Sequence, residues 1–536
     1  MTPWKKKKLM KRFAADFGKA PEKDYDPGDL EHIRSFYDAL QKNEPDRFHV
    51  DETTWKDLDL DSVYKRFNAC QCAAGEQTLY AMLRTPMDES AFREQQGLIH
   101  WIVAHPDLRL KLQLCLSSIS NRRNINLTSI FQPKDPSPHW LILYLLLGVL
   151  FVASFLAVAF LGVQFIWCPM IMLMTNTLVH TIRRGHCEYE IDRVNYCVSL
   201  VLALHRLKKG NLPRLEQYLS SAYEHLHPLK PIIRSGPVMS AINGDSLQTA
   251  LIVSLMIDLV AFEILKKQLA KYHEHFLAVH TGIGRIDASI AIASCRAQLP
   301  VVCEPQIAFD ADRAYLHIKG MVHPLLTAPV PNDLQLERSM LITGSNASGK
   351  STCLKSAMLC ALLAQTLCLC TCKYYAASPF RLYTSLALSD NLLNGESYYI
   401  AEIRSLKRIL DAARSEGYLF CAIDEVLRGT NTVERIAASA EILKALNQPG
   451  VLCLIATHDA ELCALCDGEY QLAHFEETIQ DQEIQFDYKL KPRSANTRNA
   501  ILLLKLMGFE DGIVSAAFER AERFEKTGNW TLDPSP

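Results

Sequence analysis

The strongest hydrophobic pattern in the chain is a run of 40 residues, Trp140 to Val179, that contains no charged side chain. A helix needs about 20 apolar residues to cross the hydrocarbon core of a bilayer, so this run is long enough for two crossings. Gly162 and Gln164 lie near its centre and favour a turn there. The pattern therefore predicts a transmembrane hairpin of two helices over residues 140–180. The alternative is a buried hairpin in a soluble domain, although soluble helices of this length normally carry a polar face.

Basic residues flank both ends of this run, and the presumed turn has none. Cytoplasmic loops of membrane proteins carry an excess of Lys and Arg. We therefore expect a multi-pass protein of the cytoplasmic (inner) membrane with both soluble parts on the cytoplasmic side. Pro169 either kinks the second helix or marks its start. The flanking residues are Arg122, Arg123, Lys134, Arg183 and Arg184.

A third apolar stretch, Leu247 to Leu265, differs from the run because it contains Asp258 and Glu263 and continues into Lys266 and Lys267. A charged side chain inside a bilayer is costly and is normally tied to a function. The sequence therefore predicts one long helix in water over this stretch.

The rest of the chain changes character at about residue 300. Before it, leucine and alanine recur at spacings of three and four, which predicts helices; after it, short apolar strands alternate with helices. The strand candidates are Met340–Thr343, Leu419–Ile423 and Leu452–Ala456. The expected order is a basic N-terminal segment (1–50), a first part of a helical core (51–139), the hairpin (140–180), a second part of the helical core (181–300) and an α/β domain (301–536).

Composition adds two limits. With 57 Lys and Arg against 59 Asp and Glu, the formal net charge is -2, so the chain lacks the overall basic character that many nucleic-acid binders have. The basic cluster at Lys5 to Lys8 is interpreted as a solvated tail, or else as a contact with anionic lipid. The 17 cysteines are odd in number and lie mainly in apolar segments, which indicates small core residues in a reducing compartment.

Residues 344–351 read G-x-x-x-x-G-K-S, directly after the strand candidate Met340–Thr343 and before a helix-like stretch that extends to Thr366. Strand, loop and helix in this order define a phosphate-binding loop: backbone N–H groups surround phosphate oxygens, Lys350 reaches the β- and γ-phosphates, and the Ser351 hydroxyl binds Mg²⁺. The predicted cofactors are ATP and Mg²⁺. The predicted nucleotide-binding residues are Gly344, Ser345, Asn346, Ala347, Ser348, Gly349, Lys350, Ser351 and Thr352.

Two further strand ends carry polar side chains. Asp424 and Glu425 end one apolar strand, and Thr457 and His458 end another. Asp424 suits Mg²⁺ coordination, and Glu425 suits activation of the attacking water. If the two strands are neighbours, His458 can sense the γ-phosphate; a structural histidine is the alternative.

At this point the sequence resembles the MutS family. The family's motifs correspond to the loop from Thr343 to Thr352, the run Asp424 to Thr432 (D-E-x-x-R-G-T-x-T), and Thr457-His458. Weaker likenesses lie at Ala74 to Leu79 and at Gly284 to Ala288, which resemble the start of the MutS helical core and the end of its lever helix. The resemblance implies an ABC-type, MutS-like α/β P-loop NTPase domain, C-terminal to an all-α core with lever helices. The transmembrane hairpin predicted from the apolar run would interrupt that helical core.

The resemblance also implies a homodimer with composite ATP sites, in which the segment Ser389 to Tyr398 of one subunit faces the loop of the other. Ser397 would then bind the nucleotide in trans, and Asn431 and Thr432 would lie near the dimer seam. Glu425, His458 and Lys350 would be catalytic, with Ser351 and Asp424 as Mg²⁺ ligands.

The sequence departs from the family pattern in two ways that count against direct recognition of mismatched DNA. We expect no mismatch-recognition domain, since about 50 residues precede the helical core. The F-x-E triplet Phe475 to Glu477 follows the ATPase motifs and is interpreted as incidental. DNA mismatch repair and DNA binding are therefore implied by resemblance alone.

The leading hypothesis is a membrane-anchored Mg²⁺-dependent ATPase in which ATP closes the dimer and hydrolysis opens it. The alternative is a nucleotide-gated membrane scaffold with slow hydrolysis, an unidentified protein partner and no DNA binding. An ABC transporter fits least, because two spans per chain make a thin pathway.

Overall fold

The computed structural model describes residues 3–119, 138–210, 212, 214–240, 246–345, 348–386, 398–428, 430–480, 483–493, 501 and 508–527. The chain forms two compact units. The first comprises residues 1–49 and 64–298, and the second comprises residues 50–63 and 299–536. Residues 51–63, which are predicted to lie in the helical core, thus belong with the α/β part.

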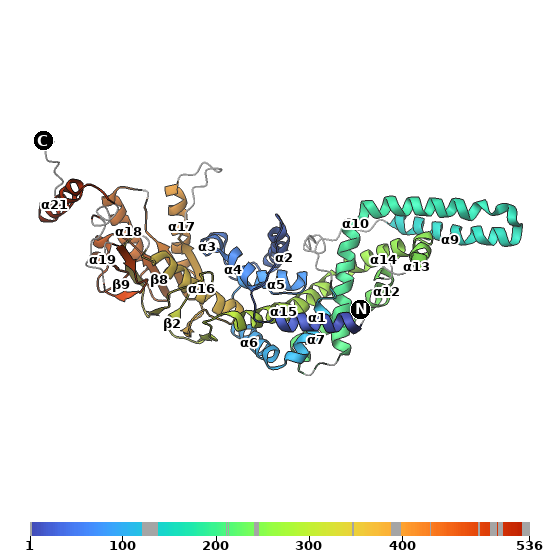
Figure 1. Cartoon of the computed structure of the whole chain (residues 1–536), viewed down its shortest axis with the longest axis horizontal. Helices are drawn as coiled ribbons and strands as arrows, with labels where there is room; N and C mark the ends of the chain where they lie inside the picture. The colour runs from blue at the N-terminus through green and yellow to red at the C-terminus, as the bar shows by residue number, and fades with distance from the viewer. Residues whose placement is uncertain are drawn as a thin grey trace. The chain divides into compact units, whose positions relative to one another are not determined.

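The first unit is built from helices (Figure 1). Their bounds are α1 Pro3–Asp16, α2 Asp29–Asn43, α4 Leu60–Phe67, which begins in the second unit, α5 Ala73–Arg84, α6 Glu89–Ala104, α7 Pro106–Leu116, α9 Pro138–Leu161, the 3₁₀ turn η1 Val163–Phe165, α10 Trp167–Lys209, α11 Glu216–Glu224, α12 Lys230–Ser240, α13 Ser246–Ser254, α14 Ile257–Lys271 and α15 His273–Gln298.

The N-terminal 50 residues do not form a separate basic segment. Helix α1 packs on α7, and α2 packs on α5. Phe13, Ile33 and Phe36 are buried in these contacts, while the lysines of α1 face solvent. The periodicity of these apolar residues, rather than the charge of the segment, decides its structure.

The apolar run forms a helical hairpin, as its length predicts. Helices α9 and α10 pack against each other, and Gly162, with φ +108°, opens the turn between them. Pro169 is the third residue of α10, where its missing N–H costs nothing, so it marks the start of the helix rather than a kink. Arg122, Arg123 and Lys134 lie outside the described residues.

The expectation of one long helix over Leu247–Leu265 is wrong. Helix α13 ends at Ser254, Met256 takes the left-handed conformation with φ +54°, and α14 begins at Ile257. Left-handed dihedrals break the repeating hydrogen-bond pattern of a right-handed helix, and for a residue with a Cβ they are also strained, because the Cβ crowds the backbone.

Helices α5 and α15 cross so closely that two glycines are required. A Cβ on Gly284 would stand 2.0 Å from Thr78 Oγ1 and 2.5 Å from the Ala74 carbonyl oxygen. A Cβ on Gly75 would stand 2.2 Å from Asp287 Oδ2. The two segments that weakly resemble the MutS core and lever are therefore packed against each other.

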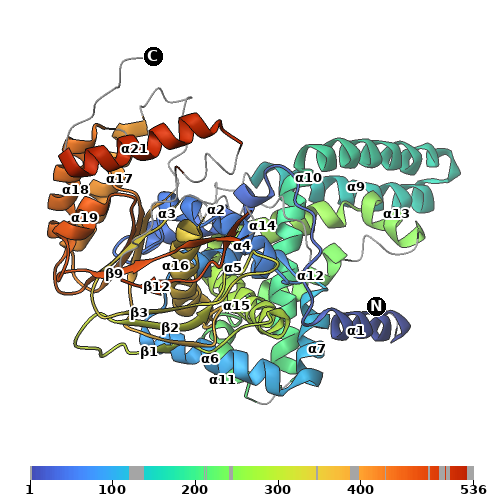
Figure 2. The same cartoon turned by 60° about the vertical axis from the view of Figure 1, so that its left-hand side comes forward.

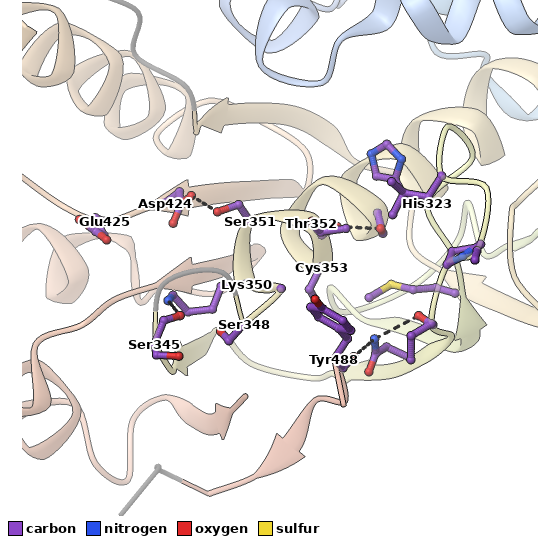
Figure 3. A pocket seen from close by; sticks show the side chains of 18 of the residues that line it. His323, Ser345, Ser348, Lys350, Ser351, Thr352, Cys353, Asp424, Glu425 and Tyr488 are labelled. Atoms are coloured by element: carbon purple, nitrogen blue, oxygen red, sulfur yellow. Dashed lines mark hydrogen bonds between the residues drawn. The ribbon is translucent and has the colours of Figure 1, made fainter. Parts of the chain in front are cut away.

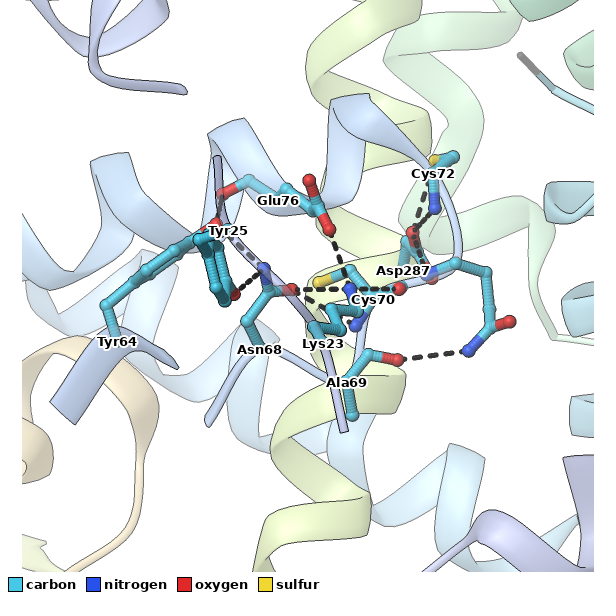
Figure 4. A network of polar contacts seen from close by, with 10 residues as sticks. Lys23, Tyr25, Tyr64, Asn68, Ala69, Cys70, Cys72, Glu76 and Asp287 are labelled. Carbon is cyan, nitrogen blue, oxygen red and sulfur yellow. Dashed lines mark hydrogen bonds and ion pairs between the residues drawn. The ribbon is translucent and has the colours of Figure 1, made fainter. Parts of the chain in front are cut away.

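A buried polar network secures the same crossing (Figure 4). Asp287 of α15 accepts hydrogen bonds from the backbone N–H groups of Gln71 (2.9 Å) and Cys72 (2.8 Å), and so caps the N-terminus of α5 from another helix. Lys23 donates to Glu76 Oε1 at 2.7 Å, and Glu76 is fully buried. Burial raises the pKa of the Asp287 carboxyl to about 6.

The second unit is a mixed α/β domain. Its elements are α3 Glu52–Asp57, β1 Gln306–Ile307, β2 Leu316–Met321, β3 Asn332–Leu336, β4 Met340–Thr343, α16 Lys350–Leu367, β5 Tyr374–Ala377, β6 Arg381–Ser385, α17 Tyr398–Ala413, β7 Leu419–Asp424, α18 Thr432–Leu446, β8 Val451–Ala456, α19 Ala460–Leu465, β9 Gln471–His474, β10 Glu477–Gln480, β11 Glu483–Phe486, β12 Lys491–Pro492 and α21 Asp511–Thr527.

The central sheet has the order β12-β9-β4-β8-β7-β6, parallel except for β12, so the three predicted strands are confirmed as neighbours. Leu419, Cys421 and Ile423 alternate along β7 and share a core cluster with residues of α17, α18 and α19. Helix α16 packs on β7 and β8 and contributes nothing to that cluster, so both faces of the sheet are covered. The remaining strands form a sheet of order β1-β5-β2-β3 and the hairpin β10-β11.

Helix α3 joins this unit through Asp57. Its carboxylate accepts hydrogen bonds from Thr384 Oγ1 (2.7 Å) and from the backbone N–H of Leu386 (2.9 Å) at the end of β6. Arg408 of α17 pairs with Asp51 just before α3. These contacts bridge more than 300 residues of sequence, as the separations of 327 and 329 positions show.

Candidate functional site

The phosphate-binding loop connects the carboxyl end of β4 to the N-terminus of α16, as predicted. Gly344 has φ +145°, and a Cβ there would stand 2.7 Å from the Phe475 carbonyl oxygen. Gly349 has φ +107° and caps α16. Both positions need glycine because of their conformation, and Gly344 also needs it for space.

The Lys350 ammonium lies over the loop. It donates to the carbonyl oxygens of Gly344 (2.7 Å) and Ser345 (2.8 Å) and stands 3.2 Å from His458 Nε2. Burial lowers the pKa of Lys350, while Asp424 and Glu425 oppose that shift. Ser348 Oγ is buried in the loop and has no hydrogen-bond partner among the described residues, so a further acceptor or donor fits there.

Ser351 and Asp424 meet at the carboxyl end of the sheet. Ser351 Oγ lies 2.5 Å from Asp424 Oδ2, and Asp424 ends β7 beside the loop. Hydroxyl and carboxylate oxygens are the ligands that Mg²⁺ prefers, and it binds through few protein ligands and several waters. The two residues predicted to hold Mg²⁺ therefore fit that ion.

Glu425 is held by two partners. His458 Nε2 lies 3.0 Å from Glu425 Oε1, and Arg428 Nε lies 2.6 Å from Glu425 Oε2. The hydrogen bond from His458 lowers the pKa of the Glu425 carboxyl, and the Arg428 charge adds to this effect. Glu425 also has φ +61°, a strained conformation for a residue with a side chain.

The adjacency of β7 and β8 explains this cluster. Asp424 pairs with Ala456 in register, and the Glu425 N–H donates to the Ala456 carbonyl at 2.9 Å. Parallel neighbours end at the same edge, so Asp424, Glu425 and His458 gather there with Lys350 and Ser351. The structure thus brings together every described residue of the predicted catalytic and Mg²⁺ sets.

A cavity of about 560 Å³ extends from this cluster past α16. Figure 3 shows the acidic pair and Ser351 on one side of the α16 N-terminus, with Tyr488 and His323 on the other. The far end is mainly apolar, and burial lowers the pKa of His323 to about 4, so this imidazole is neutral at pH 7. The residues that line the far end are Met321, His323, Leu326, Ala328, Pro329, Val330, Asn332 and Tyr488.

The segment after the ATPase motifs contributes residues to the site that the sequence did not predict. Ser345 Oγ donates to Glu477 Oε2 at 2.8 Å, and Phe475 supports Gly344. Tyr488 lies 3.3 Å from where a Cβ of Gly349 would stand. The F-x-E triplet is therefore part of the support of the loop. No periodicity or spacing in the sequence indicates this contact.

Several predicted residues lie outside the described part of the chain. Asn346 and Ala347 belong to the loop, and Gly429 follows Arg428. Ser397, with most of the segment Ser389 to Tyr398, is also outside it. Asn431 caps α18 by accepting from the Glu434 N–H at 3.0 Å, and Thr432 opens that helix.

Sheet order, loop and polar cluster together define a P-loop ATPase domain. Residues 340–525 match the family described as MutS domain V. Over these residues the chain is therefore MutS-like. Its match to "DNA mismatch repair protein MutS" of Natronomonas pharaonis is 29% identical over 269 residues, 48% of this chain and 31% of that protein.

Other relatives are similar at comparable identity over one third to one half of this chain. The protein of the same name from Carboxydothermus hydrogenoformans is 28% identical over 51% of this chain and 33% of its own length. The Thermus thermophilus protein is 30% identical over 38% of this chain and 25% of its own length. The chain therefore matches about a third or less of each relative.

Proposed function

We propose that this chain is a membrane-anchored, Mg²⁺-dependent ATPase that works as a dimer with composite ATP sites. The observation that carries the proposal is the convergence of Lys350, Ser351, Asp424, Glu425 and His458 at one sheet edge, beside a cavity of about 560 Å³. Binding, metal coordination and water activation then take place within one site.

In this proposal, Lys350 and the loop amides bind the β- and γ-phosphates, and the dipole of α16 favours their negative charge. Ser351 and Asp424 hold Mg²⁺, which neutralises charge on the phosphate oxygens when it is bound. Glu425 accepts the proton of the attacking water, and His458 orients Glu425 through the 3.0 Å contact. Lys350 must leave the carbonyl groups of Gly344 and Ser345 to reach phosphate.

The test is Mg²⁺-dependent ATP hydrolysis by the detergent-solubilised full chain. Glu425→Gln keeps the shape of the side chain and removes the base, so we expect turnover to fall by about 10²-fold or more. Glu461→Gln, an exposed carboxylate on α19, is the matched control and keeps wild-type turnover. Equal rates for wild type and Glu425→Gln would show that Glu425 is not the base.

The anchor is supported by the surface of the hairpin. The most apolar stretches of α9 and of η1 with α10 have mean hydropathies of 2.8 and 1.4, and only 17% of each is buried, whereas 72% of the most apolar stretch of α15 is buried. Arg183 stacks on Trp140 at 3.5 Å and donates to Tyr144 at 2.8 Å at one end, and Trp167 lies at the other. Aromatic side chains at both ends, with an arginine at the end nearest the core, are typical of spans at the membrane–water interface.

Partition of the expressed chain tests the anchor. The full chain should stay with membranes after a carbonate wash, and a variant with 139–180 replaced by a short polar linker should be released. Release of the full chain by carbonate would contradict the anchor.

A second candidate function is a nucleotide-gated scaffold with slow hydrolysis. The specific observation in its favour is that Glu425 is held by Arg428 and His458 with its pKa lowered, which makes the carboxylate a weaker base. It predicts dimerisation on addition of ATP with little turnover. Light scattering and phosphate release on the same sample separate the two functions.

DNA binding comes to this chain only through the names of its relatives. Because the net charge of the chain is -2, any DNA-binding surface would have to be a local basic patch. A salt-dependent mobility shift with mismatched, matched or branched duplexes would support it, and no shift at low salt for any of them would exclude it.

A further inference from the structure

Helix α13 and the start of α14 pack against the hairpin (Figure 1 and Figure 2). Helix α13 contacts α10, and α14 contacts both α9 and α10. A Cβ on Gly148 of α9 would stand 2.9 Å from the Leu255 carbonyl oxygen, so glycine lets the two backbones approach. Small residues at such crossings are typical of helix packing within membranes.

The contact between these helices is polar and closed to solvent. Asn176 Nδ2 donates to the Ser254 carbonyl at 2.6 Å, and one helical turn further His180 Nε2 lies 2.7 Å from Asp258 Oδ2. All four residues are buried. The polar side chains therefore join α10 to the junction of α13 and α14 and face no water.

The outward surface of the same bundle is apolar. Leu251 of α13 is 54% exposed, and the exposed positions of α9 and α10 include Val149 and Met174. Ser254 Oγ donates to the Ala250 carbonyl of its own helix at 2.7 Å, as Thr177 does to Leu173 at 2.8 Å. A protein in water has polar side chains on its surface. This bundle has polar side chains in its interior and apolar side chains on its surface, as is typical of helices surrounded by lipid.

The contact also lies at bilayer depth if the hairpin is embedded. Arg183, with Trp140 and Tyr144, marks the end of the hairpin nearest the helical core. Asn176 precedes Arg183 by seven positions on the same helix, which is about 10 Å at 1.5 Å per residue. Ser254, which Asn176 contacts, therefore lies about 10 Å inside the interfacial ring.

We propose that α13 is a third membrane-embedded element, a short helix held against the core-proximal half of the hairpin by the Asn176–Ser254 and His180–Asp258 contacts, with its Leu251 side facing lipid. The proposal rests on the membrane anchor proposed above. Helix α14 follows α13 along the chain, and the single residue Tyr272 separates α14 from α15. Helix α15 ends at Gln298, after which the main part of the ATPase unit begins. The lipid-embedded part and the ATPase unit are thus linked by consecutive helices.

The test measures quenching of a fluorescent amino acid by lipids with brominated acyl chains. The probe is incorporated genetically in the full chain at Leu251, at Val149 as the hairpin reference, or at Val103, an exposed apolar position on α6. The chain is reconstituted in phosphatidylcholine–phosphatidylglycerol vesicles. We expect quenching at Leu251 to be at least half of that at Val149 and several-fold above that at Val103.

Quenching at Leu251 equal to that at Val103, with Val149 strongly quenched, would overturn the proposal and leave the anchor intact. A second protein covering α13 would give this same result. Absence of quenching at Val149 as well would overturn the anchor and this proposal together. All three probe sites are exposed, so the substitutions do not disturb packing.

Discussion

The crossing of α5 and α15 gives a quantitative prediction for Gly284→Ala. The added Cβ would stand 2.0 Å from Thr78 Oγ1 and 2.5 Å from the Ala74 carbonyl, and the carbonyl belongs to a helix backbone that cannot rotate away. Overpacking of this kind costs about 1–3 kcal/mol, and we expect the upper part of that range. Alanine is better than glycine in a helix by about 1 kcal/mol, so the net destabilisation is about 1–2 kcal/mol.

The assay is thermal unfolding of the detergent-solubilised chain with hydrogen exchange over residues 73–84. At roughly 2–4 °C per kcal/mol, Gly284→Ala should lower Tm by about 2–8 °C and speed exchange in α5. Gly185→Ala is the matched control: it lies in α10 with nothing within 4 Å of the new Cβ, so Tm should stay or rise.

The second-site test removes the nearest obstacle. Thr78→Ala deletes the hydroxyl, so in the Gly284→Ala background it should recover part of the lost stability, with a coupling free energy of about 0.5 kcal/mol or more. A Tm for Gly284→Ala equal to that of Gly185→Ala would refute the reasoning, because it would show that the two helices separate without cost.

Three further predictions concern single side chains. Burial raises the pKa of Asp287 from 3.8 to about 6, so its contribution to stability is complete below pH 3.8 and is lost as the pH rises through 6, a loss of about 3 kcal/mol. Asp287→Asn should therefore flatten the dependence on pH, between these values, of the free energy of unfolding measured in urea. Parallel pH profiles for the variant and the wild type would contradict the assignment. Lys350→Ala should weaken binding of a fluorescent ATP analogue by about 10–100-fold, since charged hydrogen bonds to phosphate are lost; unchanged affinity would exclude its role. Tyr488→Ala should raise KM for ATP by about 2–10-fold with kcat kept, because its ring lines the cavity; a fall in kcat alone would contradict this.

The catalytic half of the site was predictable because each motif is local. Gly344 to Ser351 lie between a strand and a helix that their own sequences specify, and Asp424 and His458 each follow a short apolar strand. The parallel order of β4, β8 and β7 then brings the three strand ends to one edge. Local pattern plus one rule of sheet geometry is enough for this part.

The rest depends on contacts between distant segments. Glu477 and Tyr488 reach the loop from more than a hundred positions away, as the separation of 132 for the Ser345–Glu477 bond illustrates. Asp57 joins the ATPase unit through β6, and no local pattern distinguishes it from other acids of the helical part. The break at Met256 was hidden because its flanks, Leu255 and Ile257, continue the apolar run. In each case tertiary packing, not propensity, decides the outcome.

Helix α10 runs without a break from Trp167 to Lys209, so one helix of 43 residues belongs to both the hairpin and the helical core. It bends sharply where it leaves the hairpin and enters the core (Figure 1 and Figure 2). Because the helix continues through the bend, a rearrangement among the core helices that changes the angle of the bend would swing the hairpin without breaking α10. The bend would then act as a hinge between the helical core and the proposed membrane anchor.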